Sequence, residues 1–148
     1  MKTFTLTCLA ACLALGTGLT RAEEEPSMIE TMGDMQYFIH KLELSVRAGN
    51  NDLVEFYAHE VEENIEKAQG IEEYHGIRVG ELTTAMLIPA FEAFEEAVDG
   101  KDHGAVDAGL DRLIKACNAC HQATDYGFIN IVRRKDNPYM QSFEPEDD

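Results

Sequence analysis

Cysteine is scarce in this chain of 148 residues. Of the four present, Cys8 and Cys12 lie in an apolar N-terminal stretch, and Cys117 and Cys120 stand three residues apart near the other end. A disulfide framework needs more cysteines at wider spacings. The sequence therefore excludes such a framework and predicts a domain that depends on its core, with the second Cys pair free for another task.

Basic residues are also few. The chain has 12 Lys and Arg against 28 Asp and Glu, which gives a net charge of −16. An acidic surface repels phosphate backbones and anionic headgroups, so we expect neither nucleic acid nor a membrane surface as a partner. The same charge favours solubility and would steer a basic protein partner toward the chain.

No apolar run is long enough to span a membrane. The longest, from Phe4 to Leu19, is short and interrupted, and it lies between Lys2 and Arg21-Ala22. This pattern predicts a signal peptide over residues 1–22 and export to the periplasm. A lipobox-like Leu9-Ala10-Ala11-Cys12 is the alternative, although it leaves a very short apolar region before the cysteine.

Cleavage after Ala22 leaves one domain, residues 23–148. Removing Lys2 and Arg21 leaves ten basic residues against 28 acidic ones, a net charge of −18. From Pro26 onward apolar residues recur at steps of three and four, and no segment resembles a strand. We expect an all-α, antiparallel four-helix bundle. Its helices are predicted at about 26–48, 51–69, 81–98 and 102–124, with an extended tail after them.

The sequence Cys117-Asn118-Ala119-Cys120-His121 is typical of c-type haem attachment. Two thiols add across the two vinyl groups of a haem, and the following imidazole is placed to bind the iron. Residues three apart share one face of a helix, so both sulfurs reach one edge of the macrocycle. Such attachment takes place outside the bacterial cytoplasm, in agreement with export. The motif predicts one covalent haem c held by Cys117, Cys120 and His121.

Other uses of a Cys-x-x-Cys pair fit less well. A zinc site needs four ligands, and no second Cys pair or His-x-His supplies the fourth. A thioredoxin-like redox pair calls for a βαβ setting, which is absent here, and a plain disulfide remains the simplest alternative. No Ser/His/Asp set, phosphate loop or carboxylate dyad stands out. We therefore expect an electron carrier rather than an enzyme.

The haem is expected inside the bundle. Val106, Leu110 and Leu113 lead in helical steps to the two cysteines, so the thiols should face the core. Pro89 should kink or split the third helix. After Gly127 the tail lacks periodicity, but its apolar residues should dock on the helices. These are Phe128, Ile129, Ile131 and Val132.

The residue on the other side of the iron decides between two functions. His121 follows the start of the fourth helix by about 18 residues, and the same count back from Ala48 reaches about residue 31, within one turn. Met32 and Met35 lie on the inward stripe near that level, and methionine opposite histidine raises the potential of a haem. His40 is the next candidate. A core-filling role for both methionines and an iron without a sixth ligand also stay open.

The order of elements resembles cytochrome c-prime and its low-spin relatives, in which the attachment motif lies near the end of the last helix. The segments Gln36–Leu42, Cys117–Thr124 and Asn137–Gln141 are also similar to a family of exported monohaem proteins. The resemblance implies thioether links at Cys117 and Cys120, His121 as proximal ligand, and homodimer formation. The tail and the second connection are longer than in cytochrome c-prime.

Two functions follow from these expectations. A six-coordinate, low-spin haem would make the chain an electron carrier for a basic redox partner. A five-coordinate, high-spin haem would instead bind or sense small gases such as nitric oxide.

Overall fold

The computed structural model describes residues 26–146, and the predicted signal peptide at 1–22 lies outside them. Most of the described residues are helical, and the β-structure among them is limited to an isolated bridge between Tyr74 and Ile77, so the all-α prediction is confirmed. The elements are α1 (Met28–Ala48), α2 (Asn51–Gln69), α3 (Val79–Leu82), the π-helical turn η1 (Thr83–Leu87), α4 (Ile88–Asp99) and α5 (His103–Ala123).

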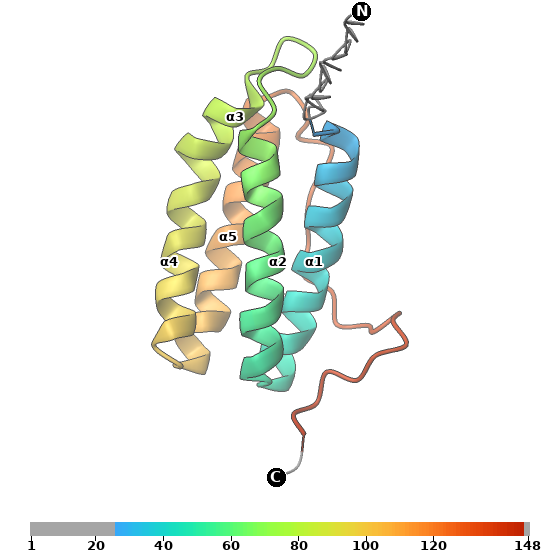
Figure 1. The fold of residues 1–148 in the computed structure, drawn as a ribbon, viewed down its shortest axis with the longest axis vertical. Helices are drawn as coiled ribbons and strands as arrows, with labels where there is room; N and C mark the ends of the chain where they lie inside the picture. The colour runs from blue at the N-terminus through green and yellow to red at the C-terminus, as the bar shows by residue number, and fades with distance from the viewer. Residues whose placement is uncertain (1–25, 147–148) are drawn as a thin grey trace, which may run out of the picture.

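The long helices lie side by side, and successive ones alternate in direction (Figure 1). The helix α1 packs mainly against α2, and α4 mainly against α5. Contact between α1 and α5 is much sparser. The tail after α5 passes along α1 from the end of the molecule that holds the attachment motif toward the opposite end.

Side-chain caps set the helix starts. Ser27 accepts a hydrogen bond from the N–H of Glu30, Asn50 from that of Leu53 and Asp102 from that of Ala105. Each cap satisfies a backbone donor that has no partner inside the helix. The first helix, predicted over about 26–48, therefore begins two residues later, because the cap at Ser27 places its start at Met28.

The interruption expected at Pro89 takes the form of the π-helical turn η1. Proline has no N–H to donate, so the usual bonding pattern fails just before it. The N–H of Ile88 donates instead to the carbonyl of Thr83, five residues earlier. Such a turn widens the helix locally and is frequent at functional sites.

The core is continuous along the bundle and contains the predicted inward residues. Leu42, Val61, Phe94, Leu110 and Leu113 are almost completely buried. Gly109 lets α4 and α5 approach closely, because a Cβ at this position would lie 3.1 Å from the ring of Phe94.

Candidate functional site

The attachment motif occupies the last turns of α5. Cys117 packs against the hydrophobic core, and Cys120 and His121 are partly buried. Burial raises the pKa of the Cys117 thiol to about 12 and also raises that of Cys120. A redox-active Cys pair has a lowered pKa instead, so these thiols lack the reactivity of a thioredoxin-like site.

The imidazole of His121 is held in one tautomer. Its Nδ1 lies 2.8 Å from the backbone oxygen of Ile129. A carbonyl can only accept, so Nδ1 carries a proton, and in the neutral imidazole the lone pair is then on Nε2. A histidine that binds a metal through Nε2 usually donates its Nδ1–H to a fixed acceptor such as a backbone carbonyl, and His121 has this arrangement.

The Ile129 carbonyl, which accepts this bond, is itself held in place by Asn118. The Cys-x-x-Cys-His motif does not specify the residue type at this position. The side-chain amide of Asn118 donates to the carbonyl of Ile131 at 2.9 Å, and its oxygen accepts from the N–H of Ile131 at 2.7 Å. The paired bonds hold the tail against α5 two residues beyond Ile129. The motif and the tail therefore form one unit.

Arg133 anchors the tail further along. Its guanidinium bonds to the carboxylate of Glu43 on α1 and to Asp111 at 2.9 Å and Asp107 at 2.6 Å on α5. Glu43 is 1 % exposed and also pairs with Arg47 at 2.7 Å. One tail arginine thus bridges α1 and α5, which contact each other much less than α1 contacts α2.

Replacing Arg133 with methionine should lower the free energy of unfolding by about 2 kcal/mol, because the buried Glu43 loses one of its two cationic partners. Chemical denaturation measures this change. The control is Arg134→Met, next in the chain, whose pair with Asp136 is exposed and should contribute almost nothing. Equal stability of the two variants would contradict the role of Arg133.

The effect of Arg133 should also depend on pH. Its hydrogen bond lowers the pKa of Asp107 in the folded state. A lowered folded-state pKa stabilises the protein above the unfolded pKa of about 3.9, and this contribution is lost as pH falls through the folded pKa. The stability difference between wild type and Arg133→Met should therefore shrink from pH 7 to pH 3.

The Arg133 contacts also give the register of α1 against α5. Arg133 bonds to Glu43 and to both Asp107 and Asp111, so Glu43 lies level with the stretch from Asp107 to Asp111. Gly109 is the midpoint of this stretch. The same number of residues separates Glu43 from Met35 as separates Gly109 from Cys117. Both helices rise equally per residue, so Met35 lies level with Cys117, and Met32 lies level with Cys120.

The two methionines differ in burial. Met35 is 5 % exposed and belongs to the core, whereas Met32 is only partly buried. The side chain of a helical residue leans toward the helix N-terminus, which directs Met35 toward the level of His121. Gly109 of α5 packs on Phe94 of α4, which fixes the register of these two helices. Equal counts of residues from this contact place η1, with the partly buried Met86, level with the two cysteines.

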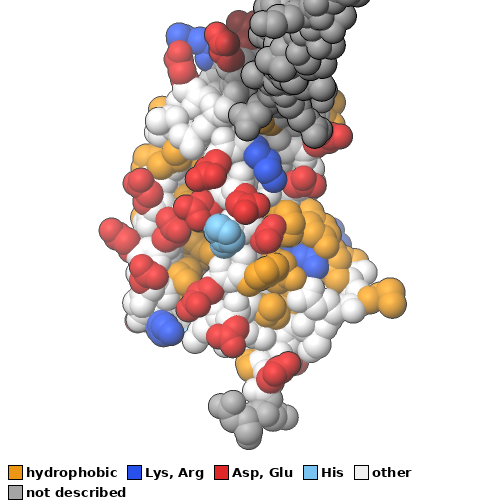
Figure 2. Space-filling view, in the orientation of Figure 1, with side chains coloured by type: hydrophobic (Ala, Val, Ile, Leu, Met, Phe, Trp, Pro, Cys, Tyr) orange, Lys and Arg blue, Asp and Glu red, His pale blue; other side chains and the backbone are white. Residues whose placement is uncertain are grey.

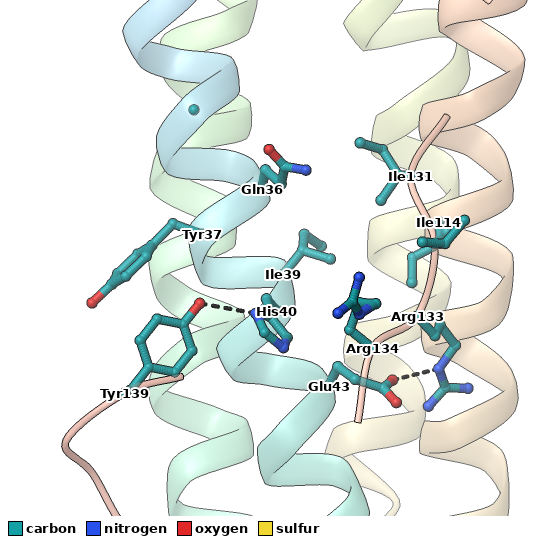
Figure 3. A pocket seen from close by; sticks show the side chains of 12 residues that line it. Gln36, Tyr37, Ile39, His40, Glu43, Ile114, Ile131, Arg133, Arg134 and Tyr139 are labelled. Carbon is teal, nitrogen blue, oxygen red and sulfur yellow. Dashed lines mark hydrogen bonds and ion pairs between the residues drawn. The ribbon is translucent and has the colours of Figure 1, made fainter. Parts of the chain in front are cut away.

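His40 is engaged by the tail rather than directed at the motif. Its Nε2 donates to the carbonyl of Asp136 at 3.1 Å, and its Nδ1 accepts from the hydroxyl of Tyr139 at 3.0 Å. Figure 3 shows this pair beside a cavity of about 260 Å³ between α1, Ile114 of α5 and the tail. Both ring nitrogens of His40 are therefore occupied.

A second anchor of the tail is a lysine among tyrosines. Lys41 is 9 % exposed, and its ammonium lies 5.0, 5.3 and 4.8 Å from the ring centres of Tyr37, Tyr57 and Tyr139. It also donates to the side-chain oxygen of Gln141 at 2.8 Å. Burial lowers the pKa of Lys41, but contacts with Tyr37 and Tyr57 outweigh it, and the net direction is upward. Within residues 26–146, the charge thus stays buried among tyrosine rings and Gln141, with no carboxylate as its partner.

Three of the four apolar tail residues expected to dock do not. Phe128, Ile129 and Val132 are 79, 44 and 58 % exposed, and the prediction for these three is wrong. Of the four residues, only Ile131 packs against the core, and further along the tail Tyr139 and Phe143 do so as well. The hydrogen bonds of the tail backbone, rather than its apolar side chains, hold this segment.

Within residues 26–146, no three His, Cys, Asp or Glu side chains lie together as a metal site. A haem needs no such cluster, since the macrocycle itself supplies four of the iron ligands. No helix of this part is long and apolar enough to cross a membrane. Comparison with protein-family models, curated proteins and solved structures gave no significant match.

Sequence reasoning missed three participants in the site, namely Asn118, the carbonyl of Ile129 and Arg133. One signal for Arg133 was present, because Arg133-Arg134-Lys135 is a rare basic cluster in a strongly acidic chain. No local pattern indicates the partners of Asn118 or His121, since both bonds depend on how the tail folds back.

Proposed function

We propose that this protein is an exported monohaem cytochrome with the antiparallel four-helix architecture of cytochrome c-prime, and that it carries electrons. The observation that carries the proposal is the hydrogen bond between His121 and the Ile129 carbonyl, which leaves Nε2 free beside two unpaired thiols. The bond supports the proposal because it occurs at the one histidine that follows the two cysteines of the motif.

The residues of the site fit a c-type haem. Cys117 and Cys120 would hold it by thioether bonds, and His121 would bind its iron. When bound, a haem supplies a one-electron redox couple. The apolar core packs against Cys117, and the Ile129 carbonyl orients the imidazole.

Met35 is the proposed sixth ligand. It is buried, lies level with Cys117 and leans toward the level of His121. His40 is disfavoured because both its nitrogens already have partners in the tail. A thioether opposite imidazole favours the reduced state and suits an electron carrier at high potential.

The acidic surface suggests the kind of redox partner. Acidic side chains are spread over the visible face, where basic ones are few (Figure 2). Such a surface attracts a basic protein and speeds its approach.

An absorption spectrum of the reduced protein, with and without carbon monoxide, tests the carrier role. We expect a low-spin spectrum that carbon monoxide changes little, because Met35 would bind the iron and compete with carbon monoxide. A high-spin spectrum with ready binding of carbon monoxide would contradict this and favour the binding or sensing of gases such as nitric oxide.

A further inference from the structure

We propose that Asn118 is a positioning residue that sets the redox potential of the haem through the tail. The proposal rests on the proposed function, because it concerns how this chain tunes His121. It assigns a role to a motif position that haem attachment leaves unspecified.

The side chain of Asn118 is matched to one peptide unit of the tail. Its amide and its oxygen bond to the carbonyl and the N–H of the same residue, Ile131, at 2.9 and 2.7 Å. Paired bonds of this kind fix both the position and the rotation of the bonded backbone. Few other side chains have a donor and an acceptor spaced to replace both bonds.

The constraint reaches His121 through a short piece of backbone. Ile129, whose carbonyl accepts from Nδ1 of His121, lies two residues before Ile131. On its other side, the N–H of Ile129 donates to the carbonyl of Tyr126 at 2.8 Å. Between these two fixed points the Ile129 carbonyl has little freedom, although the Ile129 side chain is 44 % exposed. Apolar burial does not hold it, so the hydrogen bonds must.

The strength of the bond from His121 affects the iron. A carbonyl that accepts from Nδ1–H makes the imidazole a more basic ligand. A more basic ligand favours the oxidised iron and lowers the potential. Loss of Asn118 should loosen the Ile129 carbonyl, weaken this bond and raise the midpoint potential.

Asn118→Leu removes both hydrogen bonds at nearly constant size. Ala119→Leu is the matched control, because it introduces the same side chain at the neighbouring exposed position. Asn118→Ser removes the paired bonds without added apolar surface, in case the leucine variant folds poorly. All three are measured as haem-loaded, full-length protein.

Two readouts are required. Amide exchange at Ile131 should become roughly tenfold faster in Asn118→Leu and Asn118→Ser, because its N–H loses its acceptor. The midpoint potential should rise in the same two variants and stay at the wild-type value in Ala119→Leu.

Faster exchange at an unchanged potential would overturn the proposal, as would unchanged exchange. A wild-type protein without covalent haem would overturn the proposed function, and this proposal with it. A haem-loaded protein whose midpoint potential is the same in wild type and in the Asn118 variants would overturn this proposal alone.

Discussion

Replacing Cys117 and Cys120 together with alanine should leave the protein without any covalently attached haem. Both thiols are unpaired and lie on the last turns of α5, where one macrocycle edge can meet them. In-gel haem staining after denaturation measures the loss, because only a thioether-linked haem stays with the unfolded chain. The expected effect is complete for the double variant and partial for each single one.

The helix itself should survive the double substitution. Alanine is the best helix former, and the core of this bundle is built from Leu110, Leu113 and their neighbours rather than from the thiols. Helical content by circular dichroism is therefore the control. Haem that stays attached in the double variant would show that other residues hold it.

Replacing Met35 with alanine should convert the iron from low spin to high spin and open it to carbon monoxide. The midpoint potential should fall, by an amount on the order of 0.1 V, because the thioether no longer stabilises the reduced state. Absorption spectroscopy and a redox titration measure both changes. Truncating a buried methionine also costs about 3 kcal/mol of stability, so the measurements belong well below the melting temperature.

Met32→Ala is the matched control for this experiment. It lies one turn away on the same helix and is only partly buried, so its spectrum should remain that of the wild type. The reverse result would assign the ligand to Met32. Unchanged spectra in both variants would exclude both and direct attention to Met86 or to an open sixth position.

The helices could be predicted from the sequence because local rules control them. Apolar steps of three and four gave the inward faces, and the break at Pro89 follows from its missing N–H. The first residue of the first helix was harder to predict, because Pro26 and Ser27 both suit the beginning of a helix. Only the hydrogen bond from the N–H of Glu30 to Ser27 decides between them.

The sequence motif from Cys117 to His121 was equally visible, but its surroundings were not. Lys41 and Glu43 are buried charges, which a sequence pattern assigns to the surface. They are buried because Arg133, Tyr139 and Gln141 reach them from the far end of the chain. The tail has no periodicity, so nothing local indicates these contacts.

The central claim is that the exported chain carries one covalent haem at Cys117 and Cys120. The most direct test is the intact mass of the protein expressed with its own N-terminus in a bacterium that attaches haem in its periplasm. We predict the mass of residues 23–148 plus that of one haem, still present after denaturation. A chain of the same length without this added mass would contradict the claim.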